Sequence, residues 1–126
     1  MKVIINDRRK IFAIQNDFNE LFPYLKLEFF VKPNEPGGAS PKKLTKNSSK
    51  SLGECRTIHN SGTITITPNM TVADLEENFR SVYGLSVLVL RKSGKAWLET
   101  TVTDSWTLEE QNKQGEELSK PVQKGK

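Results

Sequence analysis

The chain contains one cysteine and one histidine, and they lie four positions apart in the run ECRTIHN. A thiol and an imidazole at this spacing, Cys55 and His59, could share a metal ion or act as nucleophile and base, with Arg56 beside them. Two ligands do not complete a metal site, and the sequence supplies no clear third group to orient the histidine. We therefore predict a non-enzymatic protein without a metal or cofactor, in which Cys55 is half-buried and His59 lies on the surface.

Lysines form the second group of residues that could carry a function. The formal net charge of the chain is +4, and segment 32–50 holds five lysines and one acid. Prolines, adjacent glycines and the lack of apolar periodicity predict that this segment is a mobile loop. Charge confined to a loop favours a solubilising role over nucleic-acid binding. The alternative is a nucleic-acid accessory protein that uses a mobile basic arm, formed by Lys42, Lys43, Lys46 and Lys50.

Length and composition indicate a single domain. The 126 residues are 27% charged and 35% hydrophobic, which is typical of a polar globular protein. We predict one α+β domain over 1–118 and a disordered tail over 119–126. No apolar run is long enough to span a membrane, and the N-terminal run lacks the apolar core of a signal peptide. A lone cysteine fits a reducing compartment, so we expect a cytoplasmic protein.

Two stretches of the chain, 11–30 and 71–90, share one plan, an amphipathic helix followed by a strand. Aligning Phe18 with Phe79 matches apolar positions along both helices, and with one residue removed at the turn Leu27 and Phe29 match Val87 and Val89. Alternating strands, 1–6 and 63–67, precede the two copies. The expected buried stripe of the second helix is Val72, Leu75, Phe79 and Val82, and the expected caps of the first are Asn6 and Asp7.

Two tandem strand-helix-strand units, each a parallel pair with a right-handed crossover, predict a ferredoxin-like βαββαβ two-layer sandwich. A hairpin at Ser93-Gly94, a strand over 96–102 and a helix from 108 to about 118 would extend it. The expected strand order is 5-4-1-3-2. A β-grasp or another α+β arrangement is the main rival, and the likeness of the two stretches could also be chance.

The face of the predicted sheet that points away from the helices contains apolar residues, namely Phe30, Leu88, Leu90 and, depending on hairpin register, Trp97. An apolar patch on a solvated face needs a cover, which could be the last helix, a second copy of the chain or another partner. We predict a protein-protein interaction or regulatory module that self-associates through this face. RNA binding on the sheet is disfavoured, because the expected central strand presents Thr63, Thr65 and Thr67 and no ring.

Several runs resemble a family of small uncharacterised bacterial proteins. They are TITPNMTVADLEENF, RKSGKAWLETTVTDSWTLEEQNKQGEELS, LFPYLKLEFF and SLGECRTIHN, and they cover most of the chain outside the lysine loop. The resemblance implies a bacterial cytoplasmic origin and brings no known activity and no catalytic residue.

Overall fold

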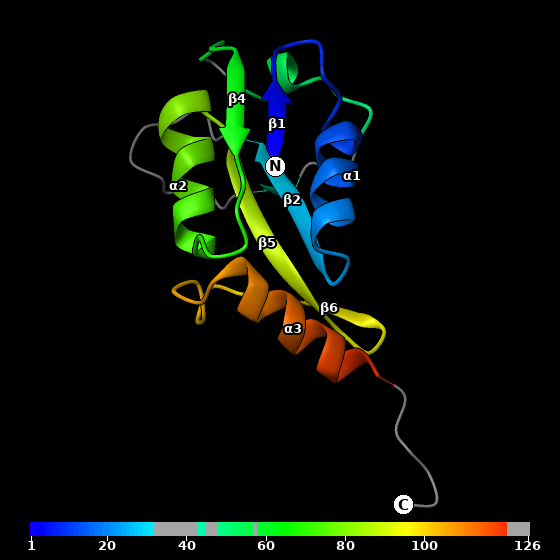
Figure 1. Cartoon of the computed structure of the whole chain (residues 1–126). Helices are drawn as coiled ribbons and strands as arrows, with labels where there is room; N and C mark the ends of the chain where they lie inside the picture. Colours follow the sequence, from blue (N-terminus) through cyan, green and yellow to red (C-terminus); the bar gives the residue numbers. More distant parts are fainter. Residues whose placement is uncertain (32–42, 45–47, 57, 121–126) are drawn as a thin grey trace, which may run out of the picture.

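The computed structural model describes residues 1–31, 43–44, 48–56 and 58–120, and Figure 1 shows the arrangement of their helices and strands. The strands are β1 (Lys2–Ile5), β2 (Leu25–Val31), β3 (Lys43–Leu44), β4 (Gly62–Thr65), β5 (Ser86–Ser93) and β6 (Ala96–Glu99). The helices are α1 (Ile11–Leu21), the short 3-10 helix η1 (Leu52–Cys55), α2 (Val72–Tyr83) and α3 (Leu108–Ser119).

The strands form two antiparallel sheets, and the chain is of the α+β class, as predicted. One sheet is a ribbon of β1 and β4, and the other has the strand order β3-β2-β5-β6. Helices α1 and α2 flank the ribbon, and these elements together lie against one face of the larger sheet (Figure 1). Helix α3 crosses the same side near the β5–β6 hairpin (Figure 1).

The ferredoxin-like order is wrong for this chain. The predicted order placed the strands 1–6 and 63–67 at the centre of a single sheet, whereas β1 and β4, which do pair antiparallel with Val3 opposite Ile64, form a separate two-stranded ribbon. It also placed 25–31 and 85–90 on opposite sides of the central pair, whereas β2 and β5 are direct neighbours. Alternation in a strand predicts which of its faces is buried, but it does not identify the partner strand. The predicted hairpin between β5 and β6 is present, with Gly94 and Lys95 as its loop.

Each strand-helix-strand unit contributes one strand to each sheet, and the registers are symmetric. Leu27 pairs with Val89 and Phe29 pairs with Val87. The sequence alignment matches 27 with 87 and 29 with 89, so exchanging the two units converts each of these pairs into the other. This register is the one expected of two units related by a pseudo-two-fold axis, although an origin by duplication stays a prediction.

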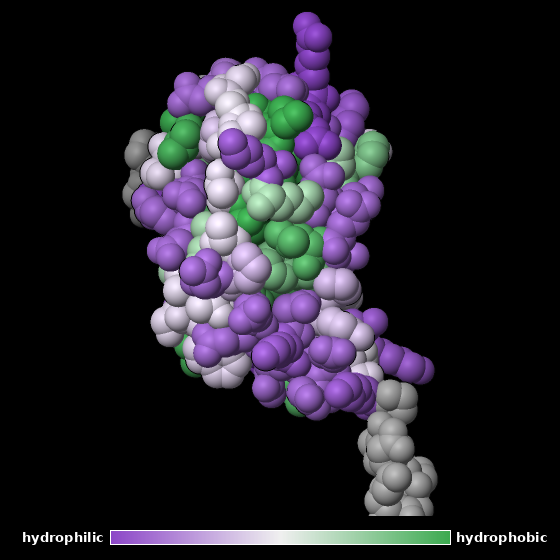
Figure 2. All heavy atoms as spheres, viewed as in Figure 1, coloured by the Kyte–Doolittle hydropathy of each residue, from purple (hydrophilic) through white to green (hydrophobic). Residues whose placement is uncertain are grey.

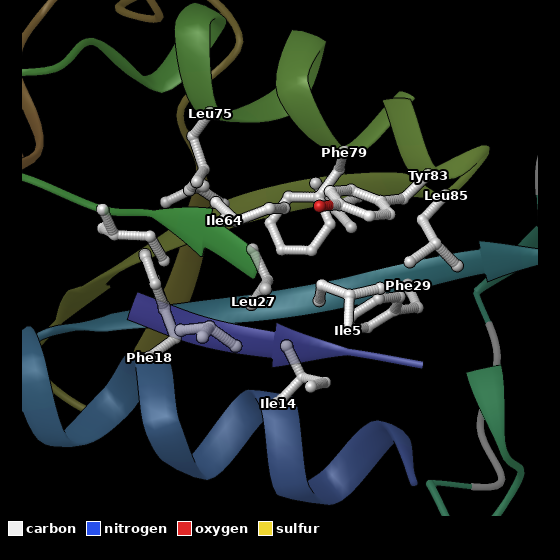
Figure 3. Packing of buried hydrophobic residues seen from close by; sticks show 14 of the residues in the cluster. Ile5, Ile14, Phe18, Leu27, Phe29, Ile64, Leu75, Phe79, Tyr83 and Leu85 are labelled. Atoms are coloured by element: carbon white, nitrogen blue, oxygen red, sulfur yellow. The ribbon is translucent and has the colours of Figure 1, made fainter. Parts of the chain in front are cut away.

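The core lies between the two sheets and the helices that flank the ribbon (Figure 3). The rings of Phe29 and Phe79 meet edge to face, with centroids 6.1 Å apart. This geometry suits the quadrupoles of two aromatic rings. The largest fully buried side chains come from both units, and they are Ile5, Ile11, Ile14, Phe18, Leu25, Leu27, Phe29, Leu52, Ile66, Leu75, Phe79 and Leu85.

The ends of α2 follow the expected local rules. The Thr71 hydroxyl accepts a hydrogen bond from the Asp74 amide at 3.0 Å, which caps the first turn. Gly84 ends the helix with φ of 63°, a left-handed conformation that glycine adopts without steric cost. One member of the expected stripe differs, because Val82 is exposed and Tyr83 is buried in its place.

Helix α1 is capped by a segment that the sequence placed in the loop. Neither Asn6 nor Asp7 caps it, and the amides of Ile11 and Phe12 donate instead to the carbonyls of Lys50 and Ser48, at 2.9 and 3.0 Å. Residues 48–50 are therefore held against the helix, and residues 43–44 form β3. The rest of the predicted mobile loop, 32–42 and 45–47, and residues 121–126 of the predicted tail lie outside the described residues.

Replacing Phe79 with alanine should lower the free energy of unfolding by about 3–5 kcal/mol, because it removes a fully buried ring. Val82→Ala is the matched control on the same helix, since Val82 is exposed and its loss should change stability by less than about 0.5 kcal/mol. Urea denaturation followed by circular dichroism measures both. Equal losses for the two variants would contradict the described packing of α2.

Candidate functional site

The four apolar residues predicted to face outward share one face of the four-stranded sheet, opposite α1 and α2. Their neighbours in β2 and β5 point into the core and are buried, so the alternate residues point away from it. The register places Phe30 beside Ser86, Leu88 beside Glu28, Leu90 beside Lys26 and Trp97 beside Lys92. Phe30, Leu88, Leu90 and Trp97 are all half-buried. We call these four residues and the charged side chains between them, Lys26, Glu28 and Lys92, the outer face.

Helix α3, one of the covers that the sequence allowed for this face, lies on the opposite side of the sheet. Arg91 is on the core-facing side of β5, and its Nη1 donates to Gln111 Oε1 at 2.9 Å. A Cβ atom on Gly115 would lie 2.9 Å from Tyr24 Cβ, so glycine allows α3 to approach the sheet closely there. In the described part of the chain, no helix therefore packs against the outer face.

Trp97 lies between two lysines on the outer face. The amines of Lys26 and Lys92 are 5.8 and 5.9 Å from the centroid of its ring. Lys26 belongs to β2 and Trp97 to β6, with β5 between them, so the aliphatic stem of Lys26 extends across β5 near Leu90. This arrangement places positive charge beside an aromatic ring.

Glu28 gives the outer face its negative charge. Its Oε2 lies 3.5 Å from the amine of Lys26, and its Oε1 accepts a hydrogen bond from Gln15 Nε2 at 2.9 Å. The same Gln15 amide donates to the Leu27 carbonyl at 2.8 Å. The outer face thus combines half-buried apolar side chains with charges of both signs.

The opposite side of the molecule carries the helices, and its hydrophilic and hydrophobic atoms are distributed differently. Hydrophilic atoms cover α3, and hydrophobic atoms gather beside the β1–β4 ribbon (Figure 2). Ile4, on the exposed side of the ribbon, keeps 55% of its surface accessible. A shallow hollow of about 520 Å³ lies beside α3 and is lined by Trp106, Glu110, Lys113, Gln114, Glu116 and Glu117. Because its walls are mostly charged side chains of one exposed helix face, it has no group aimed at a ligand.

A second cluster joins Asp7, Arg56 and His59 at the end of the molecule away from α3. The Arg56 side chain is fully buried, and it donates from Nε and Nη2 to Asp7 Oδ1 at 3.1 and 2.9 Å. Its Nη1 donates to the Tyr83 carbonyl at 3.0 Å. His59 Nδ1 lies 2.8 Å from Asp7 Oδ2. The hydrogen bond to His59, and then the contacts with Arg56, hold the pKa of Asp7 below its ordinary value.

Asp7 is the residue that sequence reasoning missed. It lies 52 positions before His59, and only the fold brings the two together. Arg56 and His59 meet through this carboxylate, but Cys55 is buried apart from it, and no contact among the described residues joins its thiol to His59. Burial raises the pKa of the Cys55 thiol, which opposes formation of a nucleophilic thiolate. The cluster therefore acts as a structural link between the β1–α1 loop, η1 and the end of α2.

The lysines of the predicted basic arm are only partly placed. Lys42 and Lys46 lie outside the described residues, Lys43 belongs to β3, and the backbone of Lys50 bonds to α1. Within the described ranges, no three His, Cys, Asp or Glu side chains gather closely enough to hold a metal ion. Those ranges also hold no helix with the length and apolar character needed to cross a bilayer.

Comparisons with known proteins found no matching family model, no matching curated protein and no matching solved structure. The resemblance to small bacterial proteins therefore stays a prediction.

Replacing His59 with alanine should raise the pKa of Asp7 toward its ordinary value of 3.8, because it removes the largest contact that lowers it. A depressed native pKa means that the stabilisation by ionised Asp7 is present above pH 3.8 and is lost as pH falls through the native pKa. The variant should therefore lose less stability than the parent on acidification below pH 3.8. Carboxyl-carbon NMR titration measures the pKa, and Ser61→Ala is the control. An unchanged Asp7 titration in His59→Ala would contradict the contact.

The thiol of Cys55 should react with a disulfide reagent more slowly in the folded protein than in the same chain unfolded in urea. Burial both hinders access and raises its pKa. The measurement is the absorbance of the released thiolate across a range of pH. A faster reaction in the folded protein than in the unfolded chain would contradict this prediction and support the hypothesis that Cys55, Arg56 and His59 form an active site.

Proposed function

We propose that this chain is a non-enzymatic interaction module that self-associates through its outer face. The observation that carries the proposal is the common orientation of Phe30, Leu88, Leu90 and Trp97 on a sheet face over which no described helix lies. Apolar side chains gathered on one face of a small domain are typical of a site for a protein partner.

The composition of the face supports a protein partner. Interfaces are enriched in large aromatic side chains such as tryptophan, and their apolar centre is bordered by polar groups. Trp97 supplies such an anchor, Leu90 lies diagonally next to it on the adjacent strand, and Leu88 follows on the same face of that strand. Lys26, Glu28 and Lys92 provide charges of both signs, so opposite charges can face each other across a contact between two copies.

The double variant Leu88→Lys/Leu90→Glu should give a folded protein of smaller mass in solution. Leu88 is opposite Glu28, so the new lysine gains an opposite charge, whereas Leu90 lies between Lys26 of β2 and Glu99 of β6, so the new glutamate gains one opposite and one like neighbour. The matched control is Thr63→Glu/Thr65→Glu, which places two charges on exposed positions of β4. Sedimentation velocity measures mass, and circular dichroism checks folding.

Two outcomes would contradict self-association through this face. One is a monomeric parent at about 100 µM, a concentration at which even a weak dimer with a micromolar Kd is populated. The other is a parent that associates and a double variant that keeps the same mass.

Single-stranded nucleic acid is the second candidate partner, and the strand order favours it more than the sequence did. The central strands of the larger sheet are β2 and β5, so Phe30 projects from a central strand and not from an edge. The Trp97 ring between the amines of Lys26 and Lys92 combines a stacking surface with positive charge.

Binding of a fluorescent oligonucleotide tests this candidate. Affinity should fall steeply as salt rises, and Trp97→Ala should weaken it at every salt concentration. Replacing Lys42, Lys43, Lys46 and Lys50 with serine should reduce the salt dependence if the basic arm contributes. No binding at low salt would eliminate nucleic acid as the partner.

A further inference from the structure

The outward edges of the described strands differ in whether side chains donate hydrogen bonds to their carbonyl groups. On the ribbon, Arg9 Nη1 donates to the Ile4 carbonyl at 3.1 Å, and the Tyr83 hydroxyl donates to the Thr63 carbonyl at 2.9 Å. On the free part of β2, the side-chain amides of Gln15 and Asn19 donate to the carbonyls of Leu27 and Leu25, at 2.8 and 3.0 Å. Side chains thus cap one or two outward carbonyls on each of β1, β4 and β2. Such caps keep an edge from pairing with another strand.

Strand β6 forms one edge of the larger sheet, and in the described part of the chain no side chain caps its outward backbone groups. The Lys92 amide donates to the Tyr24 carbonyl at 3.0 Å, so the backbone of Lys92 points toward β2, and that of Arg91 and Ser93 points toward β6. The ladder bonds between β5 and β6 therefore involve Leu98 and Ala96, their partners in the register. The backbone groups of Trp97 and Glu99 point away from β5, and no described residue bonds to them.

The charges along this edge are self-complementary. Trp97 and Glu99 belong to β6, and Lys95 is the last residue of the hairpin loop before it, so opposite charges lie two positions from the tryptophan on either side. Consider two β6 strands that pair antiparallel about a two-fold axis at Trp97. The two Trp97 residues then exchange backbone hydrogen bonds through the free groups, and each Lys95 lies opposite the Glu99 of the other copy. A short strand and a lysine can also blunt an edge, but a facing glutamate neutralises that lysine.

We propose that β6 pairs with β6 of a second copy of this chain, antiparallel and with Trp97 on the two-fold axis. This inference rests on the self-association proposed above and specifies a second contact for it. The two four-stranded sheets join into one, and the outer faces of both copies lie side by side on the same surface. The partner is the same chain because the Lys95–Glu99 pattern complements itself, and a two-fold axis is the usual symmetry of such a contact.

Charge reversal tests the register directly. Lys95→Glu and Glu99→Lys each place like charges opposite each other twice in the dimer, so each variant alone should dimerise about tenfold more weakly than the parent. An equimolar mixture of the two variants should recover the affinity of the parent, because each copy then faces opposite charges. The double variant Lys95→Glu/Glu99→Lys should recover it as well. Lys113→Glu, on the exposed side of α3, is the control for a change of charge alone.

Sedimentation equilibrium and native mass spectrometry measure these affinities, and circular dichroism checks each fold. If the parent dimerises and the single reversals and their mixture all have the affinity of the parent, the β6 register is overturned. Loss of the dimer in Leu88→Lys/Leu90→Glu would in that case still support the proposed function. If the reversals behave as expected and Leu88→Lys/Leu90→Glu keeps the mass of the parent, β6 pairing stands and the outer face is not the contact. A monomeric parent at about 100 µM overturns both.

Discussion

Pairing between the two strand-helix-strand units is the constraint on which the rest of this structure depends. β1 pairs with β4 and β2 with β5, so neither unit holds a complete sheet of its own. Phe29 from the first unit and Phe79 from the second meet in the core, and each is fully buried there. Burial of apolar surface supplies most of the stability of a small domain, and here that surface is complete only when both units are present.

The same pairing determines which strands lie at the edges of the two sheets. The ribbon has two edges and the larger sheet has two, and outward carbonyls of β1, β4 and β2 receive a side chain from a neighbouring helix or loop. The Asp7–Arg56 ion pair holds the segments around the ribbon together. It connects the loop after β1 to the segment before β4 and, through the Tyr83 carbonyl, to the end of α2. A buried guanidinium needs partners for its donors, so Arg56 holds these segments in one arrangement.

Local rules could be read from the sequence, and long-range pairing could not. The cap at Thr71, the glycine stop at Gly84 and the outward direction of Leu88 and Leu90 follow from spacing alone. The pairing of β2 with β5 does not, since alternation is satisfied by any neighbouring strand. Asp7 escaped notice because its role requires Arg56 and His59, both far along the chain. The predicted strand order put the strand 25–31, and with it Phe30, at the edge of the sheet, and this weighed against nucleic-acid binding. In the structure Phe30 belongs to a central strand.

The β1–β4 ribbon has a consequence for the way the chain reaches its native state. Val3 lies opposite Ile64, so the first strand acquires its partner only when more than half of the chain is available. Contacts between residues so far apart slow folding, because the intervening chain must be ordered before they form. During synthesis, a chain that grows from its N-terminus must hold Val3 and Ile5 unpaired until β4 has emerged. Until then, the first strand is exposed to chaperones and to other copies of the chain.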